Sequence, residues 1–109
     1  MVPFNEQSVD YPDFAKKLGN RIRQKKSEVG ILVCGSGTGM AISANKIKSI
    51  RAAVCYNIKS TRLSRQHNNA NIIALGSRLT KKQLSFKLVE IFLRTKFEGG
   101  RHLRRVKKI

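Results

Sequence analysis

Apolar and polar positions follow one another along the chain in blocks that favour alternating strands and helices. Continuous apolar runs, which are typical of strands buried on both faces of a parallel sheet, occupy residues 30–34, 50–56 and 71–76. Stretches with apolar residues every three to four positions, which predict helices, occupy residues 13–27, 40–48, 60–68 and 80–95. Because strands and helices alternate, the pattern predicts an α/β fold with a three-layer, Rossmann-like parallel sheet of about three strands.

The ends of the predicted helices depend on individual residues. The first thirteen residues contain Pro, Asn, Ser and Asp and predict a loop. The helix that follows is expected to begin at Asp13 and to end near residues 27–30. Thr80 is the expected N-cap of the last long helix, and residues 101–109 predict a short basic helix.

Length and composition favour one domain covering residues 1–109. Hydrophobic residues make up 40% of the chain, which is too many for a wholly disordered protein. No apolar run approaches the ~20 residues of a membrane helix, and the first residues do not resemble a signal peptide. Cys34 and Cys55 lie in apolar runs, which suits reduced thiols and a cytoplasmic location. No Cys/His spacing typical of zinc is present, so we expect no metal.

The chain is strongly basic, with 23 Lys and Arg against 6 Asp and Glu and a formal net charge of +17. A charge of this sign favours either a nucleic-acid-binding protein or a protein that handles anionic metabolites. The 5 Phe and 2 Tyr residues do not alternate with bases, which argues against a stacking platform for single strands. Charge alone therefore leaves both alternatives open.

A glycine-rich turn follows the first predicted strand. Gly35, Gly37 and Gly39 alternate in the segment GSGTG, between a strand and a helix. The backbone N–H groups of such a turn can bind an anion, but the same segment is also typical of a tight turn without a ligand. Cys34, the last residue of the strand, is either a reactive thiol or a small buried hydrophobic residue. Cys55 is expected to serve packing alone.

Two polar stretches further along the chain are candidates for acid–base chemistry and anion binding. His67 lies at a predicted helix end, where an imidazole serves as an acid or base or is an ordinary surface residue. Arg101 and Arg105 are four residues apart, so a helix places both guanidinium groups on one face. Two such groups suit a phosphate, although a solvated basic tail has the same pattern.

Several short motifs occur in a fixed order along nearly the whole chain. They are Asp-Tyr-Pro-Asp at residues 10–13, Cys-Gly-Ser-Gly-Thr-Gly-Met at 34–40, Ala-Asn-Lys at 44–46, His-Asn-Asn-Ala-Asn at 67–71, Ala-Leu-Gly-Ser-Arg at 74–78, and Phe-Glu-Gly-Gly-Arg-His at 97–102 with Arg105. In this combination the chain resembles the B-type ribose-5-phosphate isomerases, a family that also includes the galactose-6-phosphate isomerase subunits.

The resemblance implies aldose–ketose isomerisation of a phosphorylated sugar through a cis-enediolate, without a metal or an organic cofactor. Cys34 then corresponds to the family's base, which moves a proton between C1 and C2. Some relatives instead use a Glu at the position of Met40. Ser36 and the amides of residues 35–39 correspond to the anion hole for the enediolate. His67 corresponds to the acid and base that opens the sugar ring.

The resemblance also implies which residues hold the substrate. They are Tyr11 for a sugar hydroxyl, Asn68 for a hydroxyl or the anion hole, Arg78, Arg101 and Arg105 for the phosphate, and His102 for the sugar ring or the phosphate. In the family the site lies between two subunits, and His67, Asn68 and Arg78 are contributed across the interface. A homodimer with a shared site is therefore implied.

The family pattern includes a part that these 109 residues do not contain. Members of the family that the chain resembles begin with a strand ending in Asp-His, then a helix and a second strand, a unit of roughly 40 residues. No Asp-His pair occurs in the sequence. We therefore expect an N-terminally truncated sheet with an exposed edge and an uncovered apolar face. The alternative function is that of a catalytically inactive remnant that acts as a basic interaction or nucleic-acid-binding protein.

Overall fold

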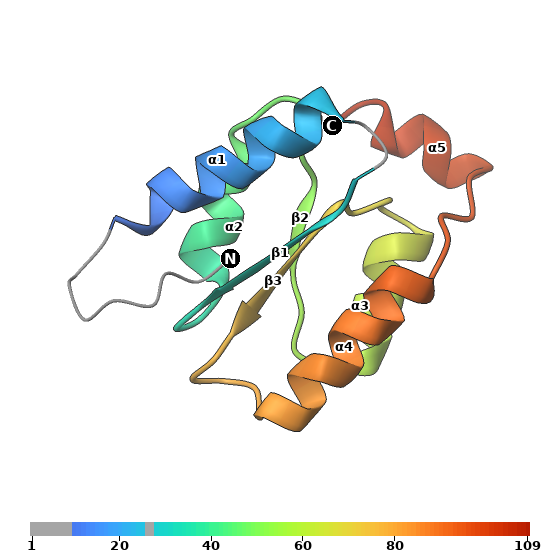
Figure 1. Ribbon diagram of the computed structural model, residues 1–109. Helices are drawn as coiled ribbons and strands as arrows, with labels where there is room; N and C mark the ends of the chain where they lie inside the picture. Colours follow the sequence, from blue (N-terminus) through green and yellow to red (C-terminus); the bar gives the residue numbers. More distant parts are fainter. Residues whose placement is uncertain (1–9, 26–27) are drawn as a thin grey trace.

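The structure of the chain is a computed structural model that describes residues 10–25 and 28–109 (Figure 1). Its helices are α1 (Tyr11–Gln24), α2 (Thr38–Asn45), α3 (Ile58–Gln66), α4 (Lys82–Arg94) and α5 (Arg101–Val106). Its strands are β1 (Gly30–Cys34), β2 (Ala52–Val54) and β3 (Ile72–Gly76). Strands and helices alternate, so the predicted α/β class is confirmed. None of the helices in the described ranges is long and apolar enough to cross a membrane.

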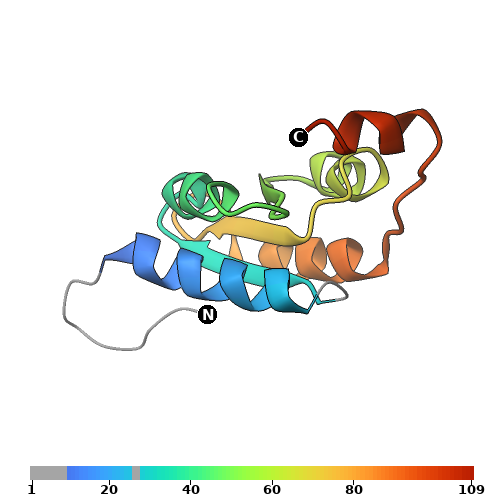
Figure 2. The same cartoon turned by 90° about the horizontal axis from the view of Figure 1, so that it is seen from above.

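Strand β3 is the centre of a parallel sheet with the order β1-β3-β2. Gly30 and Ala52 both pair with Ile72 at the end where the strands begin. Cys34 pairs with Gly76 at the end where they stop. All residues of β3 are buried, because α1 and α2 cover one face of the sheet and α3 and α4 cover the other (Figures 1 and 2). The three layers that the sequence predicts are therefore present.

Two hydrophobic clusters form because successive residues of a strand point to opposite faces of the sheet. The cluster toward α1 and α2 consists of Ala15, Ile22, Leu32, Met40, Ala41, Ala44, Ile50, Ile72 and Ala74. The cluster toward α3 and α4 consists of Cys55, Ala70, Ile73, Leu75, Leu88 and Phe92. Strand β3 supplies side chains to both clusters, so it joins the two halves of the core. Cys55 is fully buried, as its predicted packing role requires.

Helix α1 begins and ends earlier than its sequence pattern predicts. It starts at Tyr11, so the predicted loop is wrong from that residue on, while residues 1–9 lie outside the described part of the chain. Pro12 explains the earlier start, because a proline in the first turn lacks only an N–H group that has no helical partner there. The helix ends at Gln24, before the predicted residues 27–30.

Helix α4 does not use the N-cap that the sequence predicts. Its N-cap is Lys81 and the helix starts at Lys82, so the prediction of Thr80 as N-cap is wrong. Thr80 instead donates its backbone N–H to the carbonyl of Gly76 at 3.0 Å, which closes the turn after β3. The buried hydroxyl of Thr80 has no hydrogen-bond partner among the described residues.

Strand β2 is shorter than the apolar run over residues 50–56, and side-chain amides bond the backbone at its start. Arg51 donates its backbone N–H to Asn71 Oδ1 at 2.8 Å rather than to a strand carbonyl. The side-chain amide of Asn45 accepts from the N–H of Ala52 at 2.7 Å and donates to its carbonyl at 3.0 Å. Helices α2 and α3 are also displaced, and each begins two residues before its predicted start.

An apolar groove lies between β1 and α4. It is a cavity of about 490 Å³ whose apolar lining is made by Ile31, Val33, Leu75, Phe86 and Val89. Phe86 is 66% exposed, which is unusual for a phenyl ring on a helix that packs on a sheet. The sheet of the described residues has no strand beyond β1 on this side. The uncovered apolar face that the sequence predicts is found here.

Gly76 is the position at which we expect a side chain to be tolerated least. A Cβ atom on Gly76 would lie 2.6 Å from the backbone oxygen of Ser36, so β3 and the turn after β1 would have to separate. Gly76→Ala should lower the free energy of unfolding, measured by urea denaturation, by about 1–3 kcal/mol.

Gly19→Ala is the matched control for this prediction. A Cβ atom on Gly19 would also meet an atom at 2.6 Å, but that atom is Ile47 Cδ1, the end of a flexible side chain. The better helix propensity of Ala offsets the shift of Ile47, so the unfolding free energy should change by less than about 1 kcal/mol. Equal losses in the two variants would contradict this account of the turn.

Candidate active site

The turn between β1 and α2 depends on a glycine with a left-handed backbone. Gly37 has φ 82° and is the N-cap of α2. A Cβ atom on Gly37 would also lie 3.1 Å from the carbonyl carbon of Leu75, so the turn packs directly on β3. The Ser36 hydroxyl accepts a hydrogen bond from the N–H of Thr38 at 3.3 Å. The turn is therefore a fixed loop of backbone N–H groups at the carboxyl end of the sheet.

Cys34 is held at the start of this turn. Its Sγ atom accepts a hydrogen bond from the N–H of Gly37 at 3.1 Å. Its carbonyl accepts from the N–H of Ser77 at 2.8 Å and from the Ser77 hydroxyl at 3.3 Å, which ties the end of β1 to the segment after β3. The thiol is half-buried. A backbone N–H group is thus in place to interact with negative charge on the sulfur.

Tyr11 and Arg78 lie on the two sides of the turn. A Cβ atom on Gly39 would be 2.7 Å from the Tyr11 ring, including its Oη atom, so the phenol lies against Gly39. A Cβ atom on Gly35 would be 3.4 Å from Arg78 Nε, and the N–H of Arg78 donates to the Gly35 carbonyl at 3.0 Å. We call the set of predicted residues gathered here the turn half-site; it comprises Tyr11, Cys34, Gly35, Ser36, Gly37, Gly39 and Arg78.

A second group of predicted residues surrounds two stacked imidazoles. His67 is the C-cap residue of α3 and His102 lies in α5. Their ring centroids are 4.2 Å apart and their planes are 12° from parallel. His102 is buried and His67 is half-buried. We call this set the histidine half-site; it comprises the predicted residues His67, Asn68, Arg101, His102 and Arg105, together with Glu98.

Glu98 is the member of the histidine half-site to which sequence reasoning assigned no role. Its Oε1 atom lies 3.8 Å from His67 Nε2 and 3.6 Å from His102 Nε2. Its backbone N–H donates to the carbonyl of Gln66 at 3.1 Å, so the segment before α5 is tied to the end of α3. The available signal was its spacing, four residues before His102.

The electrostatic surroundings of His102 favour its neutral form. Desolvation lowers the pKa of this imidazole, and the neighbouring His67, Arg101 and Arg105 lower it further, while Glu98 alone acts in the opposite direction. One ring nitrogen of each histidine and one carboxylate oxygen of Glu98 lie within 4.8 Å of one another, as the ligands of a metal ion would. However, two nearly parallel rings do not aim their lone pairs at one point, and the arginines disfavour a cation. The arrangement suits an anion better than a metal ion.

The two half-sites lie at opposite ends of the sheet. The turn half-site follows the carboxyl ends of β1 and β3, while α3 runs back and delivers His67 to the end where the strands begin. A five-residue strand such as β1 separates the ends by roughly 16 Å. Figures 1 and 2 both show α5 at one end of the sheet and the β1–α2 turn at the other. One chain therefore does not bring Cys34 and His67 together.

Arg78 is grouped differently from the expectation. The resemblance implies that Arg78 accompanies His67 and Asn68 across a subunit interface, but its guanidinium lies against Gly35 in the turn half-site of the same chain. Arg101 and Arg105 both lie in α5, the short basic helix that the sequence predicts.

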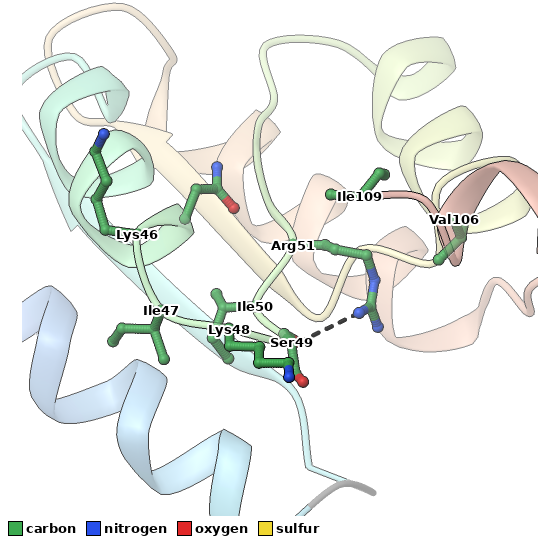
Figure 3. Close-up of a pocket in the computed structure, with 9 residues that line it drawn as sticks. Lys46, Ile47, Lys48, Ser49, Ile50, Arg51, Val106 and Ile109 are labelled. Atoms are coloured by element: carbon green, nitrogen blue, oxygen red, sulfur yellow. Dashed lines mark hydrogen bonds between the residues drawn. The ribbon is translucent and has the colours of Figure 1, made fainter.

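Arg51 ties together the turn before β2 and the turn after α3, a role that its sequence context did not reveal. Its Nε donates to the carbonyl of Asn69 at 2.8 Å and its Nη1 to that of Ser49 at 3.2 Å, and Figure 3 shows the second bond. Ser49 (φ 74°) and Asn69 (φ 48°) are the non-glycine residues with left-handed backbones among those described. Burial, and then the neighbouring Arg65, lower the pKa of Arg51. The adjoining cavity of about 220 Å³ contains Lys46, Lys48, Val106 and Ile109 in its lining.

Comparison with known proteins identifies the family. The model of the family described as Ribose/Galactose Isomerase matches residues 1–109. The chain belongs to the ribose/galactose isomerase family. A Rickettsia bellii protein named as a sugar phosphate isomerase is 48% identical over 105 residues, which are 96% of this chain and 73% of that relative.

Two solved ribose-5-phosphate isomerases share the fold of this ribose/galactose isomerase family member. The Thermotoga maritima enzyme is 50% identical, with a TM-score of 0.94 over 98% of this chain and 74% of its own. The B-type enzyme of Mycoplasma genitalium, solved with bound ribulose-5-phosphate, is 40% identical, with a TM-score of 0.94 over 99% of this chain and 72% of its own. The family and the Rossmann-like fold predicted from the sequence are confirmed.

The two thiols of the chain should react at different rates. Cys34 is half-buried, whereas Cys55 is fully buried, and desolvation raises the pKa of the Cys55 thiol. Because the thiolate is the reactive form, iodoacetamide should modify Cys34 at least ~10-fold faster than Cys55 in the folded protein. Mass spectrometry of peptides over time measures both rates. Cys34→Ser should leave only the slow reaction, and equal rates in the folded protein would contradict the assignment.

Proposed function

We propose that the protein interconverts the aldose and ketose forms of a phosphorylated sugar of the ribose 5-phosphate and ribulose 5-phosphate type. Family membership supports the reaction class, and the Mycoplasma genitalium relative binds ribulose-5-phosphate. The observation that carries the proposal is Cys34 at the head of a glycine turn, with its Sγ 3.1 Å from the N–H of Gly37. That arrangement places a candidate base beside an anion-binding backbone.

The proposed reaction passes through a cis-enediolate. The Cys34 thiolate removes the proton from C2 of the open-chain aldose and returns it to C1, while the proton of the C2 hydroxyl moves to the carbonyl oxygen on C1. The negative charge that develops on the oxygens faces Ser36 and the N–H groups of residues 35–39. Fixed donors of this kind stabilise an oxyanion without reorganising, so these groups complete the reaction without a metal or an organic cofactor.

The substrate's phosphate is proposed to bind to the basic side chains of the site. Arg101 and Arg105 are one helical turn apart at α5, which lets two guanidinium groups hold one phosphate. His102 lies between them in sequence and contacts the sugar ring or the phosphate. Arg78 is a further phosphate contact, and Tyr11 binds a sugar hydroxyl from the other side of the turn; Asn68 binds a hydroxyl beside His67.

A site that uses both Cys34 and His67 needs two copies of the chain. Cys34 and His67 lie at opposite ends of one sheet, so neither chain alone places the base and the ring-opening group on one substrate. We propose a homodimer in which the turn half-site of one copy faces the histidine half-site of the other. Two-fold symmetry then gives each dimer two such composite sites.

Mixing two inactive variants tests the composite site. Cys34→Ala and His67→Ala should each lower turnover by at least ~100-fold, the scale of lost acid–base catalysis. After the two variants are unfolded together and refolded at equal amounts, half of the dimers are mixed and each holds one intact site, so activity should recover to about a quarter of wild type. Cys55→Ala should retain activity near wild type. No recovery on mixing would contradict a site shared between copies.

Replacing one arginine of α5 tests the phosphate contact. Arg101→Ala should weaken binding of ribose 5-phosphate by roughly 1.5–3 kcal/mol, the range for charge-assisted hydrogen bonds. Arg23→Ala, which removes the same charge from an exposed position of α1, outside both half-sites, should have a much smaller effect. Isothermal titration calorimetry measures both. Binding to random duplex DNA should hardly change in either variant; a loss confined to DNA binding would favour the nucleic-acid alternative.

A further inference from the structure

The orientation of His67 depends on neighbours from another part of the chain. His67 lies at the C-cap of α3, where the helix no longer restrains its side chain, and the side chain is 39% exposed. The ring is stacked on His102, which is only 8% exposed and is held within α5. The His67 ring also lies close to the Glu98 carboxylate, with 3.8 Å between Nε2 and Oε1.

Glu98 reaches both imidazoles with one oxygen. Its Oε1 lies 3.8 Å from His67 Nε2 and 3.6 Å from His102 Nε2. The hydrogen bond from its backbone N–H to Gln66 places it beside the residue before His67. In the part of the chain that the structure describes, no other carboxylate forms an ion pair with either ring.

The charge of Glu98 opposes the effect of the positive groups around the stacked rings. Arg101 and Arg105 act on His102 from α5, and His67 acts on it from α3; all of them disfavour positive charge on the ring. Only Glu98 favours it. The rings are stacked at 4.2 Å, so a positive charge on His67 disfavours one on His102 and lowers the pKa of His102.

We propose that Glu98 is a positioning residue for His67, because one carboxylate oxygen lies within 4 Å of both Nε2 atoms and attracts the stacked rings electrostatically. The inference rests on the proposed function for the role of His67. In ring opening, His67 accepts the proton of the C1 hydroxyl as the bond between C1 and the ring oxygen breaks, and it then gives that proton to the ring oxygen. Glu98 stabilises the imidazolium that exists between the two transfers.

The test compares Glu98→Gln with Glu90→Gln. Glu98→Gln keeps the shape of the side chain and removes its charge, while Glu90 is an exposed carboxylate on α4 that pairs with Arg94 at 2.7 Å, away from the rings. Titration of His102 by NMR in the substrate-free protein should show a lower midpoint in Glu98→Gln, since the one charge that raises the pKa of this imidazole has been removed. Glu90→Gln should leave that midpoint unchanged, and Glu98→Asp should stay closer to the wild-type value than Glu98→Gln does.

Kinetics separate a positioning role from a general loss of structure. Glu98→Gln should lower kcat by about 10-fold or more, the low end of acid–base effects, with a change in KM below about 2-fold. An unchanged His102 midpoint in Glu98→Gln would overturn the role of Glu98, whatever the activity. A wild-type protein that isomerises no sugar phosphate at any pH would overturn the proposed function instead, and the NMR comparison would still decide whether Glu98 holds the rings.

Discussion

The pairing of β3 on both of its edges is the interaction on which the rest of the structure depends. Its carboxyl end carries Gly76, against which the backbone of Ser36 packs, so the shape of the glycine turn is set by β3. Its other end is preceded by Ala70, whose carbonyl accepts a hydrogen bond from the Arg65 guanidinium of α3. The carbonyl of Asn71, just before β3, accepts from the N–H of Gly30 at 2.8 Å. Both half-sites are thus attached to the two ends of one buried strand.

The separation of the half-sites follows from the fold class rather than from a detail of this sequence. In a parallel sheet every crossover helix returns the chain to the end where the strands begin. Residues that follow a strand, such as Cys34, therefore lie at one end, and residues that follow a helix, such as His67, lie at the other. A site that needs both kinds of residue requires either a long connection within the chain or a second copy. Helix α5 does not supply that connection, because it lies at the end of the sheet where the strands begin (Figure 2).

The parts of the fold that depend on local pattern were predictable from the sequence. β1 was predicted with its observed bounds, because a continuous apolar run ends directly at a glycine turn. The N-cap of α4 was not, because the backbone of Thr80 is used by the turn after β3. The stacking of His67 on His102 could not be predicted from the sequence either. The two rings come from positions far apart in the chain, and periodicity carries no signal for a single tertiary contact. The roles of the site residues came from the resemblance to a known family. No role was predicted for Glu98, because it lies in a segment without periodicity.

The strand order has a consequence for how the chain reaches its native state. β1 and β2 are not neighbours in the sheet, and the strand that joins them is the last of the three along the chain. Among the described strands, β1 and β2 therefore do not pair with each other, and each pairs with β3. Insertion of β3 between them completes both hydrophobic clusters at once. Pairing of these three strands is expected to be a single non-local event.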